Sequence, residues 1–101
     1  KIQKQCKNLI KLDLNSNSIQ RNLITSNGVS NLAKECNQLQ VLLLRRCVNI
    51  DDECIEIIAK NCPRLQSLNV ANCPLITDKS LESLGNNSKI LKSINISETK
   101  V

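Results

Sequence analysis

The sequence predicts an α/β solenoid in which short parallel strands line a concave face and helices cover the convex face. The first observation behind this prediction is an internal repeat, because segments 36–61 and 62–87 are two copies of one pattern. A repeat of this length is typical of units that cannot bury their apolar faces alone and therefore stack on one another. The second observation is that each copy begins with a strand pattern and continues with a helix pattern.

The repeat extends in both directions from this central pair. Segment 6–35 is a longer copy, and its additional residues fall within 17–24. Segment 88–101 begins a further copy, and segment 1–5 matches the tail of an earlier one. The predicted organisation is therefore a partial repeat 1–5, repeats 6–35, 36–61 and 62–87, and a partial repeat 88–101. Because solenoids need polar capping units and this chain shows none, we expect a fragment of a longer array.

The strand of each copy is predicted by an alternation of apolar and polar residues. Segment 68–70 shows this alternation, which is typical of a half-buried strand. Segments 12–14, 42–44 and 94–96 occupy the same place in the other copies. Strands stacked in this way run parallel at a spacing of roughly 4.8 Å.

The helix of each copy is predicted by an N-cap and an apolar face. Thr77–Asp78 supplies the cap ahead of Leu81 and Leu84, which share one helical face. The pairs Thr25–Ser26 and Asp51–Asp52 occupy the same place in the other copies. Small residues recur late in each helix, where we expect neighbouring helices to approach closely: Ala33, Ala59 and Gly85.

The residue types missing from the chain argue against several classes of function. None of the 101 residues is aromatic, so the chain lacks stacking platforms for bases and aromatic cages for cations. The chain has no histidine, which removes the usual general base and the commonest zinc ligand. No apolar stretch approaches the roughly 20 residues that a membrane-spanning helix needs. We therefore expect no membrane span.

The net positive charge does not by itself indicate a nucleic-acid-binding protein. The chain has 14 Lys and Arg residues against 9 Asp and Glu residues, for a net charge of +5. The basic residues are scattered, mainly over the predicted helices and the helix-to-strand loops. A stripe that follows phosphates would gather its cations on one face. We therefore expect no nucleic-acid partner.

The cysteines follow the repeat. Cys6, Cys36 and Cys62 hold the first position of their copies, and Cys47 and Cys73 hold the position after the strand. We interpret them as small buried hydrophobic residues whose S–H groups reach backbone carbonyls. The alternatives are a disulfide framework and a metal site, and zinc would require short paired spacings that are absent. We therefore expect no metal and no cofactor.

The predicted compartment follows from these thiols. Buried free thiols are typical of a reducing compartment. Two glycosylation sequons, Asn86–Ser88 and Asn95–Ser97, argue the other way. The second sequon lies on a predicted strand that faces the concave side, where a glycan would block the surface. We therefore expect a cytoplasmic or nuclear protein.

The cysteine-containing segments carry a family resemblance. Segments 36–39, 62–65 and 73–78 resemble the cysteine-containing leucine-rich repeat, which is common in F-box proteins that choose substrates for ubiquitin ligases. A closer resemblance is to the antagonist of mitotic exit network family. It rests on the lengthened first copy, segment 44–52 and the ending 97–101. The resemblance implies a right-handed leucine-rich-repeat solenoid.

The same resemblance implies a role in recognition. It points to a substrate-recognition or inhibitory domain linked to ubiquitin ligase or to mitotic exit, with a ligase substrate or a small GTPase as partner. Three residues depart from the family pattern: Asp51, Cys54 and Ser88. The F-box that would dock a ligase adaptor is not within these residues, so the link to ubiquitin comes from relatives.

The second strand marks the candidate binding site. Most predicted concave positions hold small hydrophilic residues, whereas Val41 and Leu43 are apolar and are followed by Arg45 and Arg46. An exposed apolar spot flanked by arginine resembles an interface hot spot. The alternative is that loop 17–24 covers these side chains, and this loop is itself a second candidate contact. The candidate partner-binding residues are Val41, Leu43, Arg45, Arg46, Lys11, Asp13, Asn69 and Asn95.

These observations predict a monomeric, non-catalytic protein–protein interaction module. The chain has no pairing of a nucleophile with a base, so we expect no enzyme. One alternative is an architectural solenoid segment of a larger receptor, in which surface substitutions would have no binding phenotype. Another is a cysteine-dependent enzyme fragment, which would require a thiolate such as that of Cys54 activated by nearby cations.

Overall fold

A computed structural model of the chain describes residues 6–16 and 23–101 as an α/β protein. Strands and helices alternate along the chain, which confirms the predicted order of elements. The expected partial repeat 1–5 and most of loop 17–24 lie outside the described residues. In chain order the elements are η1 (Cys6–Asn8), β1 (Lys11–Asp13), α2 (Ser26–Glu35), β2 (Val41–Leu43), α3 (Asp52–Asn61), β3 (Ser67–Asn69), α4 (Asp78–Asn87) and β4 (Ser93–Asn95).

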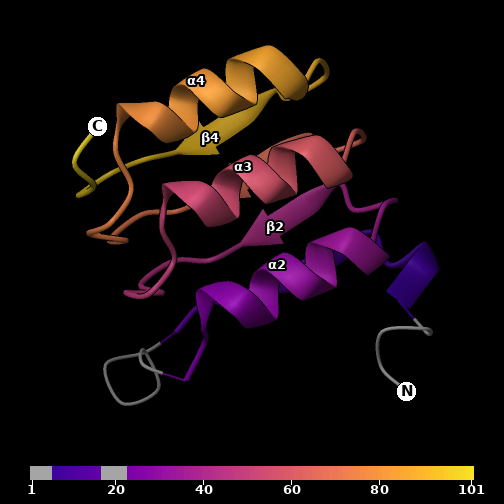
Figure 1. The fold of residues 1–101 in the computed structure, drawn as a ribbon, viewed down its shortest axis with the longest axis horizontal. Coiled ribbons are helices and arrows are strands. Elements are labelled where there is room, and N and C mark those ends of the chain that lie inside the picture. Colours follow the sequence, from indigo (N-terminus) through magenta and orange to yellow (C-terminus); the bar gives the residue numbers. More distant parts are fainter. Residues whose placement is uncertain (1–5, 17–22) are drawn as a thin grey trace.

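The four strands form one parallel sheet in the order β1-β2-β3-β4. The central residues of the strands lie in register with one another, in the order Leu12, Leu42, Leu68 and Ile94. The helices α2, α3 and α4 lie side by side over one face of the sheet (Figure 1). We call each strand with its flanking loops a rung, numbered first to fourth from β1 to β4, and the face of the sheet away from the helices the open face.

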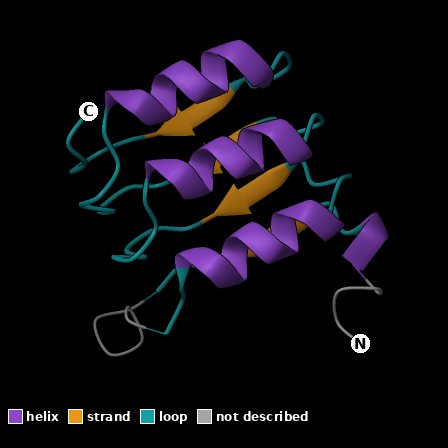
Figure 2. Cartoon of the chain, in the orientation of Figure 1, coloured by secondary structure: helices purple, strands orange, loops and turns teal. Residues whose placement is uncertain are grey.

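The strands all begin at one edge of the molecule and all end at the opposite edge (Figure 2). Each helix runs back in the opposite direction, so the helices start where the strands end. In the orientation of Figure 1 the strands begin on the right, next to η1, and end on the left. Loops from every rung therefore gather at each of the two edges.

The hydrophobic core lies between the sheet and the helices. Leu42 and Leu68 from the two central strands are each 1% exposed, and Ile55 and Ile58 of α3 are fully buried against them. The corresponding Leu12 and Ile94 of the outer strands are only partly buried. The apolar member of the strand alternation therefore faces the helices, and its polar neighbours face the open side.

The helix starts match the predicted N-caps. The side chains of Thr25, Asp51 and Thr77 each accept a hydrogen bond from a backbone N–H in the first turn, at 3.0, 3.0 and 3.2 Å. These bonds satisfy donors that a helix leaves free at its first turn. The three residues explain why each helix begins where it does.

The expectation about small residues late in the helices holds for two of the three. Ala33 and Ala59 are buried in the core, 3% and 1% exposed. Gly85 is exposed, and a Cβ added to it would meet no atom within 4 Å. The expectation of a close approach is therefore wrong for Gly85. The reason is that α4 packs against α3, whereas no described helix packs on its other side.

The described cysteines confirm the interpretation drawn from their spacing. Cys36, Cys47, Cys54, Cys62 and Cys73 are buried, and none of these five is part of a disulfide bond. Two thiols point to carbonyl oxygens of the preceding rung: Cys47 Sγ lies 3.2 Å from the oxygen of Leu14, and Cys73 Sγ lies 3.0 Å from that of Leu44. These thiols therefore act as buried donors that tie one rung to the next.

The first cysteine position behaves differently in the fourth rung. Cys62 Sγ lies 3.6 Å from the carbonyl oxygens of both Ala33 and Cys36. Ser88 occupies the same position one repeat later, and its buried hydroxyl has no hydrogen-bond partner among the described residues. Serine therefore takes the place of the thiol but does not make the contacts with two carbonyl oxygens that Cys62 makes.

Candidate functional site

The structure places the strand residues of the predicted site together on the open face. They form two rows that cross the sheet from rung to rung. The first row is Lys11, Val41, Ser67 and Ser93, and the second is Asp13, Leu43, Asn69 and Asn95. Lys11, Asp13 and Asn95 are exposed on the outer strands. Val41, Leu43 and Asn69 are partly exposed on the central strands.

The apolar pair of the second rung is thus accessible in part. Residues 17–22 lie outside the described residues, so the alternative that this loop covers Val41 and Leu43 stays open. Within the same loop segment, Leu23 is described and is 73% exposed. The described part of the chain therefore leaves an aliphatic surface on β2, on the open face of the sheet.

The polar members of the second row have a local structural role. In three rungs the side-chain oxygen at this position accepts a hydrogen bond from the backbone N–H two residues later, which closes a tight turn at the end of the strand. The three bonds are Asn15 N to Asp13 (3.0 Å), Ala71 N to Asn69 (2.9 Å) and Ser97 N to Asn95 (3.0 Å).

Leu43 interrupts this row of turn-forming side chains. Its aliphatic side chain cannot accept the hydrogen bond that the backbone N–H of Arg45 offers. Asn15 of the neighbouring rung supplies the acceptor instead, with its Oδ1 2.8 Å from that nitrogen. The turn of the second rung is therefore completed by a side chain of the first rung. Leu43 is the one member of its row with no part in forming a turn.

Arg45 and Arg46 follow β2 at the edge where the strands end, and both are exposed. Arg46 has a φ of 63°, and the residues at the same place in the third and fourth rungs, Asn72 and Glu98, have φ values of 60° and 59°. Asparagine tolerates this left-handed conformation, whereas arginine adopts it at a cost of about 1 kcal/mol. The turn thus holds a long cationic side chain at a position that suits a small one.

Neither guanidinium group is engaged by a neighbouring carboxylate of the described chain. Within residues 6–16 and 23–101, the ion pair is that of Lys60 with Glu56, at 3.1 Å. Arg45 and Arg46 therefore present two unneutralised cations beside the partly exposed Val41 and Leu43. This arrangement suits a partner that combines an apolar side chain with carboxylates.

A recess lies on the helix side of the molecule. It lies between α3 and α4 and has a volume of about 750 Å³. Lys79 is its one cation among the described lining residues, and most of the others are carboxylates: Asp51, Asp52, Glu53, Glu56 and Glu82. We call it the acidic groove. Its most constrained member is Asp52, whose carboxylate links the two helices.

The contacts of Asp52 explain its position. Its oxygens accept hydrogen bonds from the hydroxyls of Thr77 and Ser80, both at 2.6 Å, and from the backbone N–H of Thr77 at 2.9 Å. Burial alone would raise the pKa of Asp52, but these bonds and the charge of Lys79 outweigh it and lower the pKa. Asp52 is therefore a structural link between α3 and α4.

Cys54, the residue on which an enzyme would depend, lies within the core. It is 0% exposed, and burial raises the pKa of its thiol, an effect that the side chains of Ser30 and Ser26 only partly oppose. A neutral, enclosed thiol is a poor nucleophile. Among the described residues, no three His, Cys, Asp or Glu side chains lie together in an arrangement that could hold a metal ion.

Sequence reasoning predicted Val41, Leu43, Arg45 and Arg46 as candidate contacts, which stays a prediction. It missed the strained turn at Arg46 and the acceptor that Asn15 provides. No helix in the described part of the chain has the length and apolar character needed to cross a membrane. A comparison with protein-family models finds no match to this chain, and a search of curated proteins finds none either.

Proposed function

We propose that this chain is a non-catalytic protein–protein interaction module whose open face binds a protein partner at the second rung. The proposal includes a right-handed leucine-rich-repeat solenoid, with the strands on its concave face and the helices on its convex face. The parallel sheet, the helices on one side of it and the repeated caps support this architecture. Chains built in this way use extended concave surfaces for binding.

The observation that carries the proposal is the departure of the second rung from its neighbours. Leu43 takes the place of a turn-forming Asp or Asn. Arg46, like Glu98 in the fourth rung, is a long side chain in a backbone conformation that suits Asn. Leu43 and Arg46 both make the turn after β2 less favourable than Asp or Asn would at the same positions. Residues that are locally unfavourable and exposed are concentrated at functional sites, since binding can compensate for them.

The charge and shape of this site define the partner. Arg45 and Arg46 favour carboxylates, and the aliphatic side chains of Val41 and Leu43 favour an apolar residue between them. Arginine is enriched among the residues that dominate interface energies. The partner is therefore a protein that presents an apolar residue flanked by acidic ones.

The resemblance to cysteine-containing leucine-rich repeats supplies the cellular part of the proposal. The chain is then a substrate-recognition or inhibitory domain linked to ubiquitin ligase or to mitotic exit. Its partner is a ligase substrate or a small GTPase, and it acts as a monomer in the cytoplasm or nucleus. The support for this part is the likeness of segments 36–39, 62–65 and 73–78 to that repeat.

The test is a variant that copies the third rung onto the second. Leu43→Asn and Arg46→Asn introduce the residues that stand at the same positions in β3 and its turn, Asn69 and Asn72. Since Asn69 closes its own turn and Asn72 fits its φ of 60°, the double variant is expected to fold at least as stably as the wild type. Affinity capture from cell lysate, read by mass spectrometry, is expected to lose one set of partners.

A matched control separates this site from general changes of the surface. Leu75→Asn with Lys34→Asn makes the same kinds of substitution at exposed positions on the helix side and is expected to retain all partners. Unchanged capture by the Leu43→Asn/Arg46→Asn variant, with its fold verified by circular dichroism, would contradict the proposed site and favour an architectural segment. If iodoacetamide rapidly labelled a single cysteine in the native protein, the result would instead favour the alternative of a cysteine-dependent enzyme.

A further inference from the structure

The edge at which the strands begin carries a row of exposed or partly exposed positions without a carboxylate. Three positions precede each strand, and they recur at the same place in all four rungs. None of them holds Asp or Glu: Lys7, Asn8 and Ile10; Asn37, Gln38 and Gln40; Pro63, Arg64 and Gln66; Lys89, Ile90 and Lys92. Together with Lys11 at the start of β1, their cations form what we call the basic rim: Lys7, Lys11, Arg64, Lys89 and Lys92.

Hydrogen bonds between the loops fix the rim as a continuous ladder. The backbone N–H of Gln40 donates to the carbonyl of Ile10 at 2.7 Å, that of Gln66 to Gln40 at 2.8 Å, and that of Lys92 to Gln66 at 2.8 Å. The four loops are therefore held side by side at about the spacing of neighbouring strands, 4.8 Å. A ligand that crosses them meets a preorganised row of side chains.

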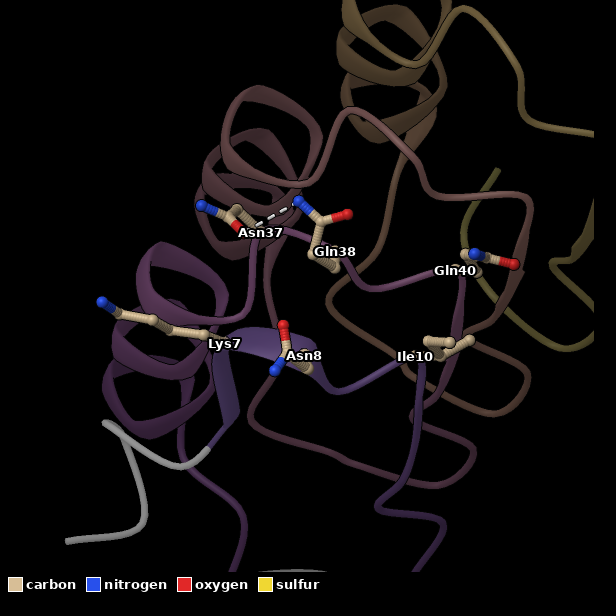
Figure 3. A pocket seen from close by; sticks show the side chains of 6 residues that line it. All are labelled: Lys7, Asn8, Ile10, Asn37, Gln38 and Gln40. Carbon is tan, nitrogen blue, oxygen red and sulfur yellow. Dashed lines mark hydrogen bonds between the residues drawn. The ribbon is translucent and has the colours of Figure 1, made fainter.

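A recess at the first two rungs adds uncharged polar groups to the rim. It has a volume of about 450 Å³ and is lined by side chains of the two neighbouring loops (Figure 3). Asn8, Gln38 and Gln40 border it, and Lys7 extends at its margin. The side chains of Asn8 and Gln40 make no hydrogen bond to another described residue, and Gln38 Nε2 makes only a long contact of 3.4 Å to Asn37. Their amides are free to bond a peptide backbone.

Two apolar side chains complete the rim. Ile10 is 52% exposed in the first rung and Ile90 is 44% exposed in the fourth. They lie three rungs apart and at different positions of their loops, so at least about 14 Å separates them, which an extended chain covers in no fewer than four to five residues. From the cations, the free amides and these two isoleucines, we infer that the basic rim binds an extended acidic segment of a partner protein, crossing the rungs.

The same observations favour a peptide over other polyanions. A single-stranded nucleic acid would need aromatic side chains on which its bases stack, and the chain has none. The amides of Asn8 and Gln40 match the alternating donors and acceptors of a peptide backbone. The nearest carboxylates along the chain are Asp13, at the other end of β1 from Lys11, and Glu35, the last residue of α2.

This surface is separate from the arginines of the proposed site at the second rung and adjoins that site at Lys11, which pairs in register with Val41. The basic rim lies where the strands begin, whereas Arg45 and Arg46 lie where β2 ends (Figure 1). The basic residues are scattered along the sequence, so their linear order does not show the rim. Only alignment of the four copies shows that the positions before each strand are never acidic.

Selection of a random eight-residue peptide library on the 101-residue chain tests the inference. The enriched peptides are expected to be rich in Asp and Glu and to contain apolar residues. Fluorescence anisotropy of the tightest peptide is expected to show binding that weakens as salt is added, because exposed charges are screened. The double variant Arg64→Glu/Lys89→Glu is expected to weaken this binding at least about tenfold, since like charges then face each other.

Two further variants sharpen the test. Lys79→Glu/Lys100→Glu makes the same change in net charge at the opposite edge of the molecule, and it is expected to leave the peptide affinity within about twofold. Gln40→Leu removes an amide without changing the charge. It is expected to weaken binding roughly three- to tenfold while the salt dependence stays the same.

Several results would overturn the inference. One is an enriched set of peptides that are neutral or basic. Another is an equal loss of affinity in the two charge-reversal variants, which would mean that only net charge matters. Oligothymidylate and vesicles that contain phosphatidylserine are measured in parallel. Tighter binding of either one, with the same dependence on Arg64 and Lys89, would assign the rim to a nucleic acid or to a lipid surface.

Discussion

At the scale of single residues, Ser88 shows what the buried thiols contribute. A buried hydroxyl without a partner costs about 1–3 kcal/mol. The Ser88→Cys substitution places in the fourth rung the group that reaches two carbonyls from Cys62. We expect it to raise the free energy of unfolding by roughly 1–2 kcal/mol, measured by urea denaturation. Cys62→Ser is the reciprocal control and is expected to lower it by a similar amount; a loss of stability in Ser88→Cys would contradict the comparison.

The turn at Arg46 separates stability from binding at a single position. Arg46→Asn replaces a residue at a φ of 63° by one that tolerates this conformation. We expect the free energy of unfolding to rise by roughly 0.5–1 kcal/mol while capture of the partner weakens. Urea denaturation and affinity capture on the same preparation measure the two effects. A fall in stability would show that the arginine side chain stabilises the turn.

At the scale of elements, the two helical glycines form a contrasting pair. In α4, Gly85 faces open space, so Gly85→Ala is expected to stabilise the chain by about 0.5–1 kcal/mol through the higher helix propensity of alanine. In α2, a Cβ on Gly28 would lie 3.1 Å from Oγ1 of Thr25, the atom that caps the helix. Gly28→Ala is therefore expected to stabilise the chain less than Gly85→Ala does, or to destabilise it. Thermal unfolding followed by circular dichroism compares the two, and an equal gain would contradict the cap geometry.

The link between α3 and α4 makes stability depend on pH. The lowered pKa of Asp52 means that its carboxylate stabilises the folded state above the usual pKa of 3.8, and this contribution is lost as the pH falls through the lowered value. Asp52→Asn is expected to reduce the free energy of unfolding by roughly 1–3 kcal/mol near neutral pH. The difference from the wild type is expected to shrink below about pH 4.

Denaturation by urea across this pH range measures the contribution of Asp52. The control is Asp78→Asn, because Asp78 stands exposed in the first turn of α4, as Asp52 stands in the first turn of α3, and its carboxylate has no hydrogen-bond partner among the described residues. A difference of equal size for both variants would show that the helix dipole, and not the link between helices, is responsible.

At the scale of the whole molecule, burial decreases from the central rungs outwards. Leu68 is 1% exposed, between Leu42 and Ile94 in the register of the sheet. Leu68→Ala is expected to lower the free energy of unfolding by roughly 2–5 kcal/mol, because it leaves a cavity. Leu12→Ala on the partly buried first strand is expected to cost less than half of this. Urea denaturation compares them, and equal losses would contradict the gradient.

The repeat accounts for what could be predicted from sequence. Because each copy has the same spacing, the inward position of Leu68 and the cap at Thr77 follow from alignment with the neighbouring copies. The bond from Asn15 to the backbone of Arg45 did not follow, since it joins two rungs and replaces a bond that Leu43 cannot make. The exposure of Gly85 did not follow either, because a repeat pattern cannot show which helix lacks a neighbour.

The acidic groove and the basic rim lie at opposite ends of the helices, and their separation gives the molecule an electric dipole moment. The carboxylates gather where the helices start, and the unopposed cations gather where the strands begin. A charged partner that approaches by diffusion therefore exerts a torque on the chain and turns one end towards itself before contact. The reach of this steering is set by the Debye length, about 10 Å at 0.1 M salt, so encounter rates fall as ionic strength rises even where the final contacts are apolar.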